Sequence, residues 1–207
     1  MEIELKYLFE NEAVKNEIFN DKYILKIKDE GSDAVTSMRA VYMDTEDGSL
    51  RKKEMAFRIR FEGSKTVATL KWGGSASEGL HMRGELNVAV EESFVEAPSL
   101  ELFRGSEIFE DIMEAVGDKP LVTVMEMNYI RRELRVDTGL SIDVISVDEG
   151  QIVTAKGSLP ICELEVELYT GDKDDMIALG RRLEEKYHLK RANRSKYQCG
   201  LELMGLL

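Results

Sequence analysis

The stretch EIELK, residues 2–6, alternates charged and apolar side chains at the very start of the chain. In an extended strand, successive side chains point to opposite faces. Glu2, Glu4 and Lys6 would therefore share one face, and the two aliphatic residues between them would share the other. Taken alone, such a strand is most simply half-solvated, with its polar residues facing water. Whether this interpretation holds depends on whether other strands carry the same kind of charged face.

The same alternation recurs in six later stretches, each with one charged and one apolar face. MAFRIRFE at 55–62 aligns two arginines, and ELEVE at 163–167 aligns three glutamates. Like charges repeated along one strand are unfavourable unless groups of opposite sign lie between them. The charged residues on these faces are Arg58, Arg60, Lys71, Arg83, Glu85, Arg131, Glu133, Arg135, Asp143, Glu163, Glu165 and Glu167.

Two arrangements of the sheet accommodate this pattern. If the apolar faces form a common core, the charged faces are solvated, as in a β-sandwich. If the sheet closes with its charges inward, the lumen becomes a polar tunnel, and helices must cover the apolar outer faces. Blocks of one sign favour the tunnel, because a solvated face would mix Thr, Ser, Lys and Glu. The residues alone leave both arrangements open.

Strand-like stretches dominate the chain, and turn signals separate them. Apolar residues at helical spacing predict two helices, at 99–117 and at 172–188. Many strands with helices as separate insertions indicate an antiparallel barrel or a strongly curved sheet. The predicted strands are 2–9, 34–43, 55–62, 66–72, 80–91, 121–136, 140–147, 151–155 and 160–169, with DEG at 148–150 as a turn.

The composition indicates a folded, soluble protein. Of the 207 residues, 43% are hydrophobic and 33% charged, which predicts one globular domain over 1–207. There is no membrane-spanning apolar run and no signal peptide. Cys162 and Cys199 fit neither a metal motif nor a disulfide framework, so we expect a cytoplasmic location. The net charge of −12 argues against a general nucleic-acid binder but permits a local basic pocket.

Seven motifs, in order along the chain, resemble those of the CYTH domain, also called the triphosphate tunnel metalloenzyme family. The family signature Glu-x-Glu-x-Lys corresponds to residues 2–6. The resemblance implies an α+β, mainly β fold, in which an eight-stranded antiparallel closed β-barrel forms a triphosphate tunnel with helices packed outside. The matching motifs are EIELK, VYMDTEDGSLRKKEMAFRIR, ATLKW, GLHMRGEL, SIDVISVDEGQI, ICELEVELYTGD and NRSKYQCG.

The resemblance also implies that cations bind a triphosphate and that carboxylates bind a divalent metal. Arginine suits two-pronged contact with phosphate oxygens, and lysine supplies compact positive charge. Mg²⁺ or Mn²⁺, the expected cofactor, prefers hard oxygen ligands. The expected phosphate-binding residues are Lys6, Arg58, Arg60, Lys71, Arg83, Arg131 and Lys196. The expected metal-side carboxylates are Glu2, Glu4, Asp143, Glu163, Glu165 and Glu167, with Glu85 as a lesser candidate.

Two adjacent arginines compete for one tunnel position. Arg131 has the opposite parity to the apolar Leu134 and Val136, so it is expected inside the tunnel in preference to Arg132. By the same parity, Arg135 would also point inward.

The implied activity is metal-dependent hydrolysis of a triphosphate, with Glu2, Glu4 and Lys6 as catalytic residues and a glutamate as general base. GLHMRGEL and PICELEVELYTGD look most like the inorganic triphosphatase branch, whose substrate is tripolyphosphate. Class IV adenylyl cyclase, thiamine triphosphatase and a non-catalytic polyphosphate- or nucleotide-binding module are the alternatives, and no feature of the sequence identifies a base pocket. The expected partner is a small-molecule triphosphate, with neither nucleic acid nor membrane, and a homodimer is left open.

Overall fold

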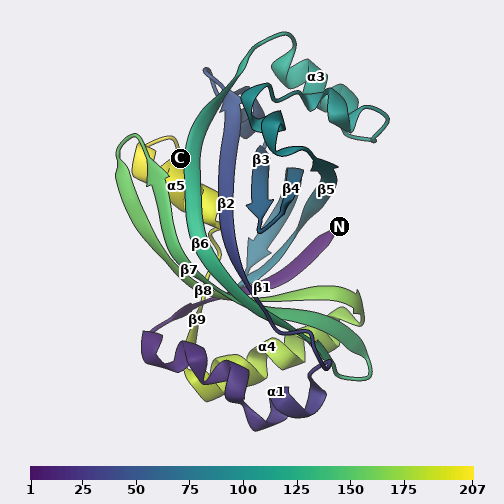
Figure 1. The fold of residues 1–207 in the computed structure, drawn as a ribbon, viewed down its shortest axis with the longest axis vertical. Coiled ribbons are helices and arrows are strands. Elements are labelled where there is room, and N and C mark those ends of the chain that lie inside the picture. The colour runs from purple at the N-terminus through teal and green to yellow at the C-terminus, as the bar shows by residue number, and fades with distance from the viewer.

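Nine strands form one sheet that curls until its ends meet. In the computed structural model, which describes residues 1–207, the strand order is β5-β4-β3-β2-β6-β7-β8-β1-β9 and all pairings are antiparallel. Strand β1 also pairs with β5, and this contact closes eight strands into a barrel (Figure 1). The predicted eight-stranded antiparallel barrel is confirmed. The strands are β1 (Glu2–Phe9), β2 (Ala34–Thr45), β3 (Met55–Glu62), β4 (Lys65–Ser77), β5 (Leu80–Val90), β6 (Leu121–Asp137), β7 (Ser141–Thr154), β8 (Gly157–Gly171) and β9 (Leu189–Arg191).

The helices lie at three places around this barrel. In Figure 1, α1 and α4 lie together at the bottom, α3 lies at the top, and α5 lies beside β7 and β8. No helix combines the length and the apolar character that crossing a bilayer requires. The α-helices are α1 (Lys22–Ile27), α2 (Ser49–Lys52), α3 (Phe109–Val116), α4 (Lys173–Tyr187) and α5 (Lys196–Met204), and the 3-10 turns are η1 (Glu12–Asn16), η2 (Ile18–Asn20), η3 (Glu92–Glu96) and η4 (Leu100–Phe103).

The apolar strand faces point outward and pack against helices, as a polar lumen requires. Leu179 and Leu183 of α4 share a buried cluster with Leu164 and Val166 of β8. A second buried cluster joins α3 to β3 and β4. Fully burying one such side chain contributes about 1.5–3 kcal/mol. These outer clusters can therefore stabilise a barrel whose interior is charged.

Helix α5 packs on the other face of the sheet, the one that lines the lumen. Its Leu201 and Met204 share a buried cluster with Tyr42 and Tyr129, and both tyrosines line the cavity inside the barrel. Ser195 caps this helix through a reciprocal pair of hydrogen bonds, a capping box, with the residue three positions on. Lys196, the first residue of α5, is thereby held at the lumen.

Strand β7 runs without interruption through residues 148–150, where DEG predicted a turn. A Cβ atom at Gly150 would lie 2.1 Å from the carbonyl oxygen of Asn128 on β6. This glycine therefore marks a close approach between two strands and not a turn. The difference matters for the site, because Asp148 lies in the continuous strand.

The predicted helix at 99–117 is two separate pieces, η4 and α3. Gly105 lies between them with a φ of +90°, a conformation that ends a helix. The apolar residues that predicted this helix are nevertheless buried together in one cluster, namely Leu100, Phe103, Ile108, Ile112 and Val116. The predicted helix at 172–188 corresponds to α4, with Asp172 as its N-cap. Helices α1, α2 and α5 have no counterpart among the predicted helices.

Candidate active site

A cavity of about 220 Å³ lies inside the barrel and is lined mainly by polar and charged side chains. Strands β1, β3, β4, β5, β6 and β8 and the start of α5 all contribute to it. The cations expected to bind phosphate all line it, namely Lys6, Arg58, Arg60, Lys71, Arg83, Arg131 and Lys196. The carboxylates that line it are Glu2, Glu4, Glu85, Glu165 and Glu167.

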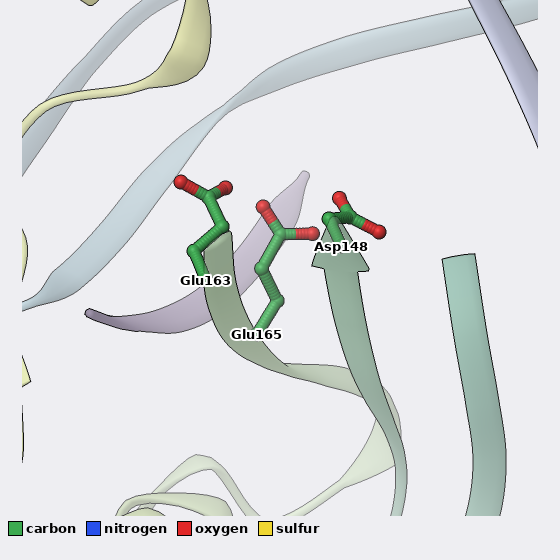
Figure 2. A group of neighbouring side chains, drawn as sticks. All are labelled: Asp148, Glu163 and Glu165. Carbon is green, nitrogen blue, oxygen red and sulfur yellow. The ribbon is translucent and has the colours of Figure 1, made fainter. Parts of the chain in front are cut away.

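Three buried carboxylates, from Asp148, Glu163 and Glu165, lie on one side of this tunnel. Each offers an oxygen, and these oxygens all lie within 4.8 Å of one another. The register of β7 and β8 explains this, because Asp148 lies directly opposite Glu163. Figure 2 shows the three side chains extending from the two neighbouring strands toward a common region. We call them the acidic triad.

Arg131 joins two members of the acidic triad. Its Nε and Nη2 donate to the two carboxylate oxygens of Asp148, each at 2.7 Å, and Nη2 also donates to Glu165 at 2.7 Å. This two-pronged geometry is the strongest that an arginine makes with a carboxylate. Although burial opposes ionisation, Lys196 and Arg131 hold the pKa of Asp148 below its ordinary value.

Two lysines from the opposite ends of the chain neutralise the remainder of the acidic triad. Lys6 Nζ lies 2.5 Å from Glu165 and 3.0 Å from Glu163. Lys196 Nζ lies 2.7 Å from Asp148 and 2.9 Å from Glu165, and it also contacts Glu163. Burial opposes ionisation of Glu165, but Lys196, Lys6 and Arg131 hold its pKa well below the ordinary value. Burial outweighs the lysines at Glu163 and raises its pKa.

A second charged group surrounds Glu2. Lys71 Nζ lies 2.6 Å from Glu2 and 2.6 Å from Glu85. Arg83 donates to Glu2 at 2.5 Å and to Glu4 at 3.0 Å. Burial would raise the pKa of Glu2, but Lys71 and Arg83 lower it further than burial raises it. Glu2 is thus ionised, and both expected catalytic carboxylates, Glu2 and Glu4, are paired with cations in the tunnel.

Arg58 is the tunnel cation with no carboxylate partner. It is only 8% exposed, its Nε is buried without a hydrogen-bond partner, and its one side-chain hydrogen bond runs from Nη1 to Tyr42 Oη at 3.5 Å. A buried charge without a partner is costly. An anion that enters the tunnel can remove this cost, and the guanidinium is positioned to meet it.

Glu167 is a tunnel carboxylate that also forms no ion pair with a cation. It lies directly opposite Glu4 in the pairing of β1 with β8. Burial, followed by the charges of Glu2 and Glu4, raises the pKa of Glu167 to about 7. Glu167 therefore carries a proton for part of the time at neutral pH.

Asp143 does not lie in the tunnel, and its expected place there was wrong. It is fully buried on the outer face of β7, with the same parity as Ile145 and Val147, which pack against α4. Ser141 Oγ lies 2.6 Å from Asp143 Oδ2 and 2.9 Å from Asp175. The aspartate of β7 on the tunnel side is Asp148, which contacts the tunnel-lining Arg131 and Lys196.

The two arginines that competed for one position point to opposite sides. Arg131 faces the tunnel, whereas the guanidinium of Arg132 lies 4.1 Å from the centre of the Phe19 ring on the outside. The expectation for Arg135 was wrong, because it is exposed and donates to Asp29 at 2.8 Å.

Sequence reasoning missed Asp148, although a signal for it was present. The alternation that matters in β7 is set by Ile145 and Val147, which face outward. Continuing it through residue 148 would have placed Asp148 inward with Ser146. Reading DEG as a turn ended the predicted strand at residue 147, directly before Asp148, although β7 continues to Thr154.

The acidic triad has the chemistry that a divalent metal site requires. Its donors are carboxylate oxygens, which Mg²⁺ and Mn²⁺ prefer, and neither histidine nor cysteine is among them. Glu4 lies close to the triad, since Lys6 Nζ is 3.7 Å from it. The acidic triad thus fits a metal-binding role once Lys6 and Lys196 move away from its carboxylates.

Comparison with known proteins gives one family. The CYTH domain matches residues 1–198. An inorganic triphosphatase of Haemophilus influenzae is 31% identical over 135 residues, which cover 65% of this chain and 37% of that protein. The chain thus spans little more than a third of that relative's length.

Two solved structures share the fold along nearly the whole chain. One is a Hippeastrum protein described as a candidate adenylyl cyclase with a dominant triphosphatase activity, with a TM-score of 0.72, 20% identity and coverage of 100% of this chain and 97% of the other. The second is a candidate adenylate cyclase of Bacillus halodurans, with a TM-score of 0.65, 21% identity and coverage of 96% of both chains. At these identities the likeness concerns the fold.

Proposed function

Because the chain belongs to the CYTH domain family, we propose that it is a metal-dependent hydrolase of triphosphate substrates. The observation that carries the proposal is Arg58, a buried guanidinium without a carboxylate partner, facing a cavity lined by six further cations. Such an arrangement favours a ligand with several negative charges along its length.

The balance of charge within the tunnel supports a triphosphate that binds together with a metal ion. Seven cations line the cavity, and seven carboxylates lie on its wall or in the acidic triad. The ligand-free tunnel is therefore close to neutral. A triphosphate alone would add a large negative charge, and a metal alone would add positive charge among lysines. When the two bind together, the positive charge of the metal compensates the negative charge of the triphosphate.

Binding would exchange partners within the tunnel. Lys6, Lys196 and Arg131 would turn from the acidic triad toward phosphate oxygens, and the freed carboxylates would hold the metal. The bound metal would supply Lewis-acid polarisation of the phosphoryl group and a more acidic water. The cations would stabilise the charge that develops on the transferred and leaving groups. Because most of these residues lie on strands, the site is rigidly placed.

We assign the residues roles as follows. Asp148, Glu163 and Glu165 would hold the metal, with Glu2 and Glu4 on the neighbouring strand β1. Glu2 or Glu4 is the proposed general base, since β1 pairs with β8 and places both residues on the strand next to Glu165. The proposed phosphate-binding residues remain Lys6, Arg58, Arg60, Lys71, Arg83, Arg131 and Lys196.

Inorganic tripolyphosphate is the proposed first substrate, supported by the identity shared with the Haemophilus influenzae enzyme. Mg²⁺ or Mn²⁺ is the proposed cofactor. The cytoplasm is the proposed location, supported by two cysteines that are both free.

The test is phosphate release from tripolyphosphate, ATP and thiamine triphosphate, with Mg²⁺ or Mn²⁺ and with a chelator. We expect rapid, metal-dependent release from tripolyphosphate. Cyclic AMP and pyrophosphate from ATP would instead indicate an adenylyl cyclase. Tight triphosphate binding without turnover of any substrate would contradict the proposal and leave a binding module.

A further inference from the structure

One of the tunnel cations, Lys196, does not lie on a strand. The other six belong to strands of the barrel, whereas Lys196 is the first residue of α5. The segment before it, residues 192–195, forms neither strand nor helix. Lys196 nevertheless contacts all three members of the acidic triad. Contacts other than strand pairing must therefore fix the backbone that carries this lysine.

Four hydrogen bonds hold this segment at the place where β1 meets β5 and closes the barrel. The backbone N–H of Lys6 donates to the carbonyl of Gly79 at 2.8 Å, and the N–H of Gly79 donates to Asn193 Oδ1 at 2.8 Å. The N–H of Ala192 donates to the carbonyl of Lys6 at 3.0 Å. His81 Nε2 lies 2.8 Å from the carbonyl oxygen of Ala192, and because that oxygen can only accept, the ring nitrogen is the donor. We call these five residues the clasp.

The clasp connects the backbones of the two lysines that share one carboxylate oxygen. Its hydrogen bonds use both the N–H and the carbonyl of Lys6, and the segment that it holds leads directly into Lys196. The ammonium groups of both lysines contact Glu165 Oε1. Gly79 permits the close approach, since its φ is +80° and a Cβ atom there would lie 3.0 Å from the carbonyl oxygen of Lys6. The separation of the two lysines therefore depends on the clasp.

His81 points to the tunnel side of β5 but does not reach the tunnel cavity. It lies directly opposite Glu4 in the pairing of β5 with β1, and it is only 4% exposed. It is not among the residues that line the tunnel cavity. Its Nε2 is occupied by the carbonyl of Ala192, a residue that is itself buried. Any effect of His81 on the reaction therefore passes through the segment that carries Lys196.

We propose that His81 and Asn193 are positioning residues, which hold Lys196 at the acidic triad by fixing the segment before it. This inference rests on the proposed triphosphate hydrolysis, in which Lys196 binds phosphate oxygens. A displacement of about 1 Å at a catalytic group can lower turnover by about 10²-fold. Loosening the clasp therefore slows the reaction without removing any group from the tunnel.

The test measures kcat for tripolyphosphate with Mg²⁺ in clasp variants. His81→Leu removes the donor to Ala192, and we expect kcat to fall about 10–100-fold. His81→Gln places an amide N–H near the position of Nε2 and should restore kcat to within about threefold of the wild-type value. Leu179→Ala is the control, since it truncates a buried side chain of α4 outside the barrel, lowers the melting temperature and should leave kcat unchanged. If His81→Leu does not fold, Asn193→Ala takes its place, because the Asn193 side chain is exposed.

A double-mutant cycle with Lys196→Met separates positioning from a general effect on the fold. If His81 acts through Lys196, His81→Leu causes no further loss of kcat once the lysine is gone. The inference would be overturned by an equal loss of kcat in both backgrounds, by full activity of His81→Leu, by failure of His81→Gln to restore activity, or by the same loss in Leu179→Ala. Each of these results would leave the proposed function standing.

If the wild-type chain does not hydrolyse tripolyphosphate, the proposed function fails, and the same cycle measured by urea denaturation decides the inference. Smaller destabilisation by His81→Leu in the Lys196→Met background than in the wild-type chain would support it, because the ion pairs that the clasp positions are already missing there. Equal or larger destabilisation in that background would overturn it.

Discussion

Lys6 and Lys196 contact the same carboxylate oxygen, Glu165 Oε1, at 2.5 Å and 2.9 Å. One lysine comes from the first strand and the other from the last helix, so the two ends of the chain meet at the acidic triad. Despite burial, the carboxylates around Lys6 raise its pKa, and the same is true of Lys196. Both ammonium groups are therefore charged at neutral pH.

Replacing Arg58 by methionine should separate binding from folding. Arg58 lacks a carboxylate partner and has an unpartnered Nε. We expect an unchanged or raised melting temperature, because a buried guanidinium that forms no ion pair is removed. Turnover of tripolyphosphate should fall about 10²–10³-fold, as for loss of one group that stabilises transition-state charge. The exposed Arg39→Met, on neighbouring β2, should leave turnover unchanged. A variant that loses only melting temperature would show that Arg58 has no tunnel role.

Arg131 and Arg132 offer a matched pair of adjacent residues. Arg131→Ala should abolish turnover and destabilise the fold by about 3–5 kcal/mol, because Asp148 and Glu165 lose their shared partner. Arg132→Ala removes a contact with Phe19 outside the barrel and should cost about 0.5–2 kcal/mol with turnover retained. Phosphate release and chemical denaturation of both variants provide the comparison. The opposite ranking would place Arg132 in the tunnel.

The buried Asp143 predicts a stability that falls as pH rises. Burial raises the pKa of this carboxyl to about 6, with the charge of Asp175 adding to burial and the Ser141 hydrogen bond opposing it. A raised carboxyl pKa favours the folded state below the ordinary value of 3.8, and that stabilisation is lost as pH rises through about 6. Asp143→Asn should therefore stabilise the protein at pH 8 by about 1–3 kcal/mol and have less benefit at pH 5.

Urea denaturation at the two pH values measures this difference. The exposed Asp118→Asn serves as control and should change stability at neither pH. Equal destabilisation by Asp143→Asn at both pH values would mean that the carboxyl is ionised in the folded state and needed there.

Removing metal should abolish activity without unfolding the protein. Lys6, Lys196 and Arg131 already neutralise the acidic triad, so the fold needs no metal to compensate those carboxylates. We expect a chelator to stop phosphate release from tripolyphosphate while the melting temperature stays nearly constant. Adding back Mg²⁺ or Mn²⁺ should restore the activity. A large drop in melting temperature on chelation would instead reveal a structural metal.

Much of this fold follows from alternation along the strands. Glu2, Glu4 and Lys6 point into the lumen as the period of two requires, and so do Arg58 and Arg60. The apolar residues between them supply the outer clusters. Parity identifies which face each side chain occupies, because a strand allows only two. It also assigned Arg131 correctly over Arg132.

The parity argument assigned Asp143 to the wrong face of β7, because it was counted from the wrong apolar residues. In β7, Asp143 alternates with Ile142 and Val144, but the buried apolar pair is Ile145 and Val147. The choice between the two parities depends on what packs against the strand, and α4 decides this by covering one face. Likewise, Gly150 reads as a turn until the approach of Asn128 is known.

The sequence by itself determined which side chains alternate, and hence a barrel with a charged interior and apolar outer faces. Only the tertiary structure decided that Asp148 joins Glu163 and Glu165 and that Arg58 has no carboxylate partner. The physical reason is that periodicity is a property of one strand, whereas ion pairs and cavities depend on distances between strands and helices far apart in the chain.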